Sequence, residues 1–276
     1  MFTFELSQLL PLIALLLVIG AFAGIVAGLL GVGGGIVLVP AFFYMFDALG
    51  YDGENLMQIC VATSLATIIF TSIRSVVSHN KKGAVDWDIL KRWAPGIAIG
   101  ATLGVLIARE LRSVSLMVLF GILGALVGLY LAFGRPSWRL GDEMPTRIGR
   151  FTTAPVLGFL SVLMGIGGGS FGVPLMTLYN QPIHRAIATS AGFGVLIAVP
   201  SVIGFLMIGW SMPVKPPLTV GLINLPTFAI VVSMTMITAP LGVKLAHAMD
   251  PKPLKLAFAF FIMLMALNML RKAIWG

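Results

Sequence analysis

The sequence carries little charge. Only 10% of its 276 residues are Asp, Glu, Lys or Arg, against about 25% in soluble domains, and 58% are hydrophobic. The mean hydropathy of +1.03 agrees with this imbalance. Several apolar runs approach the ~20 residues that a helix needs to cross ~30 Å of hydrocarbon. The composition therefore excludes a mostly wet surface and predicts an integral membrane protein.

Residues that carry catalytic chemistry are also scarce. Cys60 is the only cysteine, so an internal disulfide is excluded, and its apolar surroundings indicate a buried packing thiol. No cluster with metal-ligand spacing, no nucleophile–base pairing and no P-loop occurs in the sequence. We therefore expect neither an enzyme nor a bound metal or cofactor.

Carboxylates are missing from the apolar runs. All ten Asp and Glu residues fall in loops or at helix ends, whereas cation and proton transporters usually keep a carboxylate inside the membrane. The interior offers backbone N–H groups, hydroxyls, Asn224, Asn268 and Arg74 instead. This set of groups suits an anion and disfavours a metal cation.

The apolar runs form two series with a polar stretch between them. The stretch near 134–150 is rich in Arg, Pro and Gly and marks a boundary. We expect a first membrane repeat at 1–134, a cytoplasmic linker at 135–150 and a second membrane repeat at 151–276. The runs lie at 9–30, 36–49, 58–78, 93–108 and 114–133, and then at 151–165, 170–180, 186–208, 218–246 and 252–270.

Three motifs recur in the same order in both halves. The segment GVGGGIVLVP at 31–40 returns as GIGGGSFGVP at 165–174. The triplet ATS at 62–64 returns at 188–190, and LGV at 103–105 returns at 241–243. Ordered repetition of this kind indicates an internal duplication, which is common in secondary transporters and places the substrate site between the repeats.

Segment lengths favour one topology over another. We predict an all-α membrane protein in which each repeat is a Gly-rich helical hairpin followed by three transmembrane helices, which makes the repeats inverted. A rival arrangement makes each glycine segment part of one broken crossing and gives eight spans with parallel repeats. About 40 residues from 9 to 49, twice the length of one crossing, favour the hairpins.

The basic residues then orient the bundle. With a net charge of +8 but no continuous basic patch or nucleic-acid-binding motif, they indicate topology rather than nucleic-acid binding. The positive-inside rule assigns the richer side to the cytoplasm, which leaves both termini outside. That side holds twelve, namely Lys81, Lys82, Lys91, Arg92, Arg135, Arg139, Arg147, Arg150, Arg185, Lys244, Lys252 and Lys255; the other holds five, namely Arg109, Arg112, Lys215, Arg271 and Lys272.

Two glycine clusters are the strongest site signal. Glycine triplets break helices, and lipid forbids the resulting unpaired backbone unless it lines an enclosed or wet cavity. A helix that begins after each triplet would direct free N–H groups and its positive dipole end at that cavity, which would bind an anion. The alternative is that the glycines only permit close helix packing. The candidates are Gly33, Gly34, Gly35, Gly167, Gly168 and Gly169.

Hydroxyls at matching positions could complete such a site. Thr63, Ser64, Thr189 and Ser190 could donate to anion oxygens, or they could bond their own helix backbone. Ser170 is a further donor with no hydroxyl counterpart at Ile36. For an electrostatic or gating role the candidates are Arg74, which could instead snorkel to the interface, and His79, which could titrate near neutral pH.

These motifs resemble the TauE/SafE family of sulfite and organosulfonate exporters. The resemblance rests on GLLGVGGGIVLVP, the first ATS, HNKKGAVDWDIL, MGIGGGSFGVP and ATSAGFGVLI, and it covers essentially the whole chain. It implies a secondary transporter of sulfite, sulfoacetate, taurine-related sulfonates or similar small anions, located in the cytoplasmic (inner) membrane and working by alternating access. An anion channel, or an anion-binding sensor or assembly component that does not transport, are the alternatives. The sequence leaves the oligomeric state open.

Overall fold

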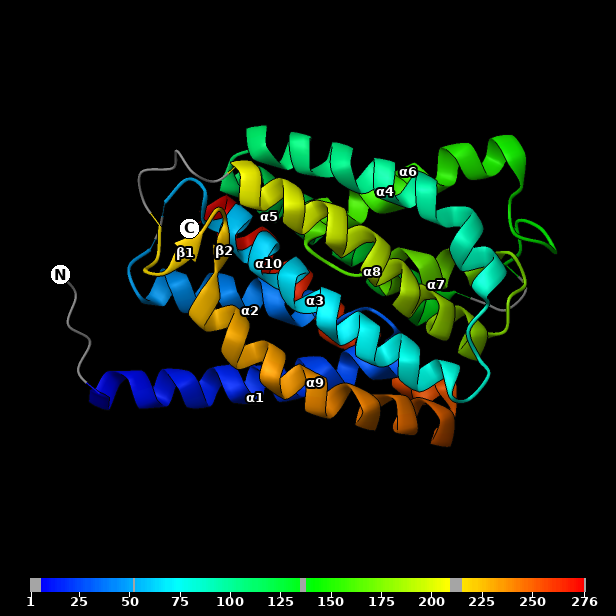
Figure 1. Ribbon diagram of the computed structural model, residues 1–276, viewed down its shortest axis with the longest axis horizontal. Helices are drawn as coiled ribbons and strands as arrows, with labels where there is room; N and C mark the ends of the chain where they lie inside the picture. Colours follow the sequence, from blue (N-terminus) through cyan, green and yellow to red (C-terminus); the bar gives the residue numbers. More distant parts are fainter. Residues whose placement is uncertain (1–5, 52, 135–137, 209–214, 276) are drawn as a thin grey trace.

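The apolar runs form helices, as their length and composition predict. The computed structural model describes residues 6–51, 53–134, 138–208 and 215–275, and these residues form ten α-helices and one two-stranded hairpin (Figure 1). The elements are α1 (Leu6–Leu30), α2 (Gly35–Ala48), α3 (Leu56–Asn80), α4 (Trp87–Glu110), α5 (Ser113–Phe133), α6 (Arg147–Met164), α7 (Gly169–Leu178), α8 (Ile183–Ile208), β1 (Thr219–Val220), β2 (Ile223–Asn224), α9 (Leu225–Ala248) and α10 (Pro251–Trp275).

Six helices in the described part of the chain are long and apolar enough to cross a membrane, namely α1, α3, α4, α5, α8 and α9. The shorter apolar helices α2 and α7 have 14 and 10 residues, too few to cross ~30 Å. An all-α membrane protein is therefore confirmed. The Gly-rich hairpins consist of α1 with α2 and of α6 with α7.

Several helix boundaries differ from the predicted runs, two of them at the strand hairpin and at the linker. The run at 218–246 does not begin as a helix, because Gly221 turns the chain at φ 58° and β1 pairs antiparallel with β2. The helix begins only after Asn224, whose side chain accepts the N–H of Thr227 at 3.1 Å and so caps α9. At the other boundary, α6 begins at Arg147, inside the predicted linker.

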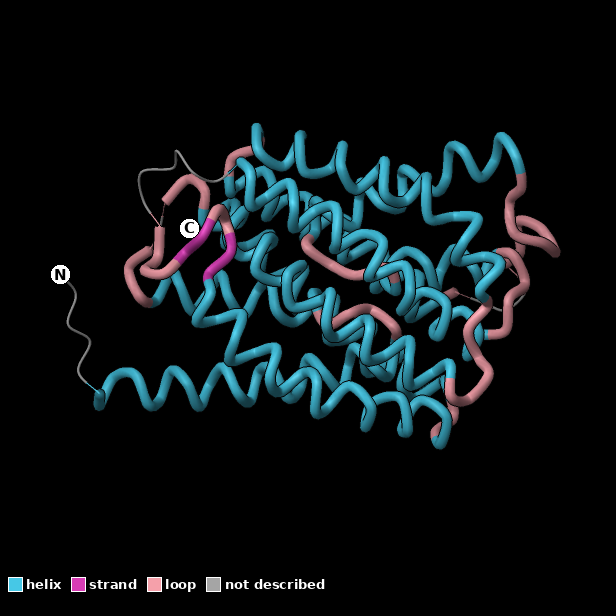
Figure 2. Tube along the Cα trace, viewed as in Figure 1, coloured by secondary structure: helices cyan, strands magenta, loops and turns pink. Residues whose placement is uncertain are grey.

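Loops gather at two opposite ends of the bundle (Figure 2). The basic end holds the 81–86 loop, the described parts of 134–146, and the 179–182 and 249–250 turns; an ion pair between Asp86 and Arg185 joins two of these segments at 3.7 Å. The opposite end holds the described parts of the 49–55 turn, the 111–112 turn and the strand hairpin. In Figure 1, α1 and α6 run in opposite directions between these ends, and so do α3 and α8.

Each of the main helix pairs joins one helix from the first half of the chain to one from the second half. α3 and α8 contact each other at the centre, α5 packs along α10, α1 packs on α9, and α6 packs on α4. Glycines permit the last two contacts: a Cβ on Gly24 of α1 would lie 2.8 Å from Thr235 Cα of α9, and one on Gly104 of α4 would lie 2.9 Å from Val162 of α6. Gly104 and Gly242 of the repeated LGV motif therefore have a packing role.

Candidate functional site

Both glycine clusters lie inside the bundle. Figure 2 shows two loops in its interior, away from both ends. They are the first glycine loop, residues 31–34, and the second glycine loop, residues 165–168, and every residue in both is buried. Gly31, Gly33 and Gly34 have φ of 67°, 74° and 85°, so the first loop requires glycine for its backbone conformation.

The two glycine loops contact each other through their backbones. Gly167 donates its N–H to Val32 O at 3.0 Å. A Cβ on Gly35 would lie 2.8 Å from Ile166 Cα, and a Cβ on Gly169 would lie 2.6 Å from Val32 N. Each half thus lays the first turn of its short helix against the glycine loop of the other half. Two halves related by a two-fold axis would make reciprocal contacts of this kind.

Each short helix begins at the last glycine of its cluster, as predicted. α2 begins at Gly35 and α7 at Gly169. Within the described part of the chain, the N–H groups of Gly169 and Ser170 donate to no backbone or side-chain acceptor, and the buried Ser170 Oγ has no hydrogen-bond partner. The start of α7 therefore combines free donors with a positive dipole end.

A cavity of about 390 Å³ lies at the basic end, between α5, α7 and α10. Its charged lining residues are Arg139, Lys252 and Lys255, and no Asp or Glu is among the residues that line it. Lys255 Nζ lies 5.5 Å from the centre of the Tyr130 ring and 3.4 Å from Gly134 O. We call this cavity the basic vestibule. Its potential attracts anions.

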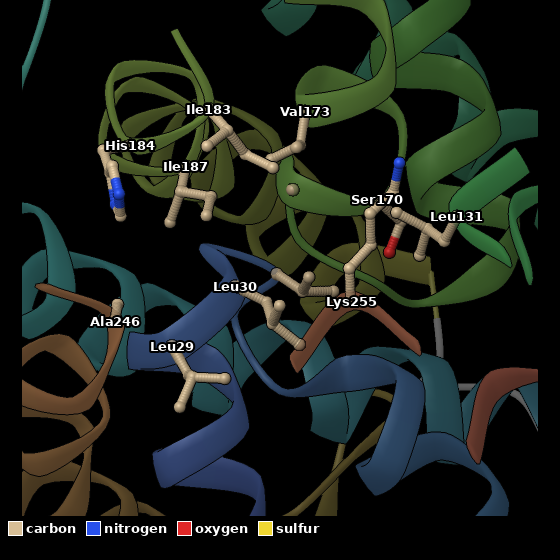
Figure 3. A pocket seen from close by; sticks show the side chains of 12 residues that line it. Leu29, Leu30, Leu131, Ser170, Val173, Ile183, His184, Ile187, Ala246 and Lys255 are labelled. Atoms are coloured by element: carbon tan, nitrogen blue, oxygen red, sulfur yellow. The ribbon is translucent and has the colours of Figure 1, made fainter. Parts of the chain in front are cut away.

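The basic vestibule continues into a narrow, mainly apolar throat of about 30 Å³ (Figure 3). Leu131, Val173, Ile183 and Lys255 line both spaces, and Gly169 and Ser170 are among the other residues that line the throat. This volume is far smaller than that of the basic vestibule, so the space narrows between the vestibule and the start of α7.

The opposite end has a different electrostatic character. A cavity of about 280 Å³ there is lined by both signs of charge, Asp47 and Glu54 with Arg112 and Lys272. Asp47 and Lys272 form an ion pair at 3.3 Å. The excess of positive charge over a cavity is thus confined, among the cavities described here, to the basic end.

The repeated hydroxyls lie next to the glycine loops but already have protein partners. Thr63 Oγ1 accepts the N–H of Asn224 at 3.0 Å, and Thr189 Oγ1 accepts the N–H of Asp86 at 2.9 Å. Asn224 and Asp86 are the N-caps of α9 and α4, so each threonine positions the start of a helix. Asn224, expected as a free interior donor, has this capping role instead.

The serines of the same motif contact the second loop and α7. Ser64 donates to Gly165 O at 2.8 Å, and Ser190 lies 3.7 Å from the sulfur of Met176. These two hydroxyls bond to other segments rather than to their own helix, and only the Ser64 bond joins the two halves. Whether any of the four repeated hydroxyls donates to an anion stays a prediction.

The two candidates for an electrostatic role occupy different environments. The Arg74 side chain is exposed on the outer face of α3, where snorkelling is possible. His79 is buried and lies 3.0 Å from Gly28 O and 3.2 Å from His247. Sequence reasoning counted Arg139, Lys252 and Lys255 only as topology determinants; the signal that could have singled out Lys255 is its place one turn inside an apolar helix.

A helical bundle with apolar spans, interior broken helices and a charged vestibule defines a multi-pass membrane transporter. Residues 16–269 match the family model described as Sulfite exporter TauE/SafE. The chain belongs to this family.

Curated relatives agree with that class. A probable membrane transporter protein of Haemophilus influenzae is 32% identical over 94% of this chain and 98% of its own length. A second, from Methanocaldococcus jannaschii, is 28% identical over 97% of each chain, and YunE of Bacillus subtilis, also named a probable membrane transporter, is 32% identical over 64% of this chain and 71% of its own. No solved structure matches the chain.

Proposed function

We propose that this transporter carries a small anion, with sulfite or an organosulfonate such as sulfoacetate or a taurine-related compound as its substrate, across the cytoplasmic membrane. The observation that carries the proposal is the route from the basic vestibule through the throat to Ser170. Cationic side chains attract the substrate at one end of this route, and unpaired N–H and hydroxyl donors stand at the other.

The donor set suits an oxyanion. Two backbone N–H groups at a helix N-terminus and one hydroxyl can each donate to a different oxygen of a sulfite or sulfonate group. No carboxylate lines the basic vestibule or the throat, so no fixed negative charge competes with the substrate. The TauE/SafE family description names sulfite export, which agrees with this chemistry.

Alternating access would account for the narrow throat. The two glycine loops lie where the halves meet, and a shift of one half against the other would separate their backbone contacts and widen the throat. The opposite directions of α1 and α6, and of α3 and α8, agree with inverted repeats. A throat as narrow as about 30 Å³ favours a carrier over an open anion channel.

The test places a negative charge at the proposed site. In proteoliposomes loaded with isethionate, Ser170→Asp should abolish exchange of radiolabelled isethionate or sulfite, because a carboxylate repels the anion. Ser170→Asn introduces a side chain of nearly the same volume as Asp but without its charge, so this variant should keep measurable exchange. Equal exchange by wild type and Ser170→Asp, with both proteins folded, would exclude this site. Accumulation against a gradient separates a carrier from a channel, and binding without flux would identify a sensor.

A further inference from the structure

All three histidines of the chain meet at the basic end of the bundle. His79 ends α3, His184 begins α8 and His247 ends α9. The rings of His79 and His247 are 5.3 Å apart with Nδ1 and Nε2 at 3.2 Å, and the rings of His184 and His247 are stacked at 5.6 Å with an angle of 17°. His184 also lines the throat that leads to Ser170 (Figure 3). Three separate helices therefore bring every imidazole to one cluster beside the substrate route.

The hydrogen bonds of His79 fix its tautomer. A carbonyl can only accept, so His79 Nε2 carries the hydrogen that it donates to Gly28 O at 3.0 Å. In the neutral ring Nδ1 is then an acceptor, and His247 Nε2 donates to it. Gly28 belongs to the last turn of α1, where carbonyls lack helical partners. His79 thus holds the helix end that leads into the first glycine loop.

The charged residues nearest the cluster are mostly basic. α1 contributes no charged residue. The positive charge of Lys82 interacts with the His247 ring, and Lys244 lies one turn before His247 on α9. Arg185 follows His184 and is paired with Asp86. Since no carboxylate contacts the rings among the described residues, two adjacent imidazolium ions would repel each other without compensation.

Unpaired hydroxyls continue from His79 into the bundle. Ser72 and Ser75 lie seven and four residues before His79 on α3, on the same helix face. Both are buried, and their Oγ atoms have no partner in the described part of the chain. Ser72 Oγ would lie 3.2 Å from a Cβ on Gly33, so this hydroxyl abuts the first glycine loop. Buried hydroxyls without protein partners are the groups that ordered water satisfies.

We propose that His247 and His79, beside the stacked ring of His184, relay one proton between the basic end and the water-bridged hydroxyls of Ser75 and Ser72, and that this proton is coupled to the anion. The inference rests on the proposed function. A proton from water binds His247 Nδ1; the N–H bond at His247 Nε2 breaks as one forms at His79 Nδ1. His79 then passes its Nε2 proton to water held by Ser75, and the bond to Gly28 O is lost.

The test uses isethionate, whose sulfonate stays ionised near neutral pH, so that any pH effect belongs to the protein. Exchange without a pH gradient measures the proposed function, and accumulation driven by a pH gradient measures the relay. His79→Gln keeps an amide that can donate to Gly28 O but cannot carry a proton. We expect this variant, and His247→Gln, to keep exchange and to lose gradient-driven accumulation and substrate-dependent proton flux down to the level of empty vesicles.

Matched variants separate the relay from general damage. Ser75→Ala should lower gradient-driven accumulation, whereas Ser161→Ala removes an equally buried, unpartnered hydroxyl from α6, outside the path, and should not. If His79→Gln fails to fold, His247→Gln tests the relay instead. The His247 side chain is exposed, so its replacement should not disturb folding. Accumulation by these variants equal to that of wild type overturns the relay alone. No isethionate or sulfite exchange by the wild type overturns the proposed function as well.

Discussion

Gly167 donates its backbone N–H to the carbonyl of Val32, 3.0 Å away, and so ties the second glycine loop to the first across 135 residues of sequence. The bond joins two segments that have left helical geometry in the middle of a membrane bundle. Backbone N–H and C=O groups without hydrogen bonds are costly there. The bond between Gly167 and Val32 satisfies one such group in each loop. In the proposed alternating-access mechanism, this contact would break when the halves separate.

Closeness of the two glycine loops predicts a steric effect at Gly169. Gly169→Ala would place a Cβ 2.6 Å from Val32 N, and backbone cannot move aside as a side chain can. Overpacking of this kind costs about 1–3 kcal/mol, so we expect a lower Tm and loss of anion exchange.

The control for Gly169→Ala is Gly128→Ala in α5. Its nearest neighbour would be the flexible end of Met263 at 3.3 Å, so this variant should change neither Tm nor exchange. Equal behaviour of the two variants would contradict the close packing of the loops.

Thr63 and Thr189 should contribute similarly to stability. Valine in place of either threonine keeps the shape but leaves the N–H of Asn224 or Asp86 without its acceptor. A buried unpaired donor costs about 1–3 kcal/mol, which should lower Tm in each variant. Thr63→Ser should retain most of the stability. Thr102→Val, at an exposed position on α4, should leave Tm unchanged. An equal loss of Tm in Thr102→Val would contradict the assignment of the effect to the buried N–H groups.

Lys255 should determine how well a dilute anion enters the basic vestibule. Lys255→Met removes a positive charge from the passage that joins the vestibule to the throat. Focusing of charge in a cleft raises local anion concentration and on-rates by about 10-fold or more, so we expect a KM at least ~10-fold higher and weaker dependence on salt. Lys255→Arg should stay close to wild type. An unchanged KM for Lys255→Met would show that the anion enters elsewhere.

The basic end should face the cytoplasm. Lys81→Cys and Glu54→Cys place thiols at opposite ends of the bundle, both at exposed positions, while the native Cys60 is fully buried. A maleimide that cannot cross the membrane should label Glu54→Cys in intact cells and Lys81→Cys only after permeabilisation. The reverse labelling pattern would show that the basic end and its vestibule face away from the cytoplasm.

The sequence by itself determined the membrane class, the helical content and the interior glycine loops. Apolar run length decides which segments can cross lipid, and glycine triplets interrupt helices wherever they stand. Both are properties of local sequence, which is why α2 and α7 begin at the predicted glycines. The boundary at Asn224 was missed because the run at 218–246 is mostly apolar, and only the Gly221 turn and the Asn224 cap separate its first residues from the helix.

The partners of polar groups were decided by the tertiary structure alone. Thr63 and Ser64 are neighbours on α3, yet one accepts from Asn224 on another helix and the other donates to Gly165 in a loop about 100 residues away. His79, His184 and His247 look like unrelated helix-end residues in sequence and meet only because α3, α8 and α9 end together. Hydrogen-bond reach is about 3 Å, and no periodicity in the chain specifies which distant helices come within it.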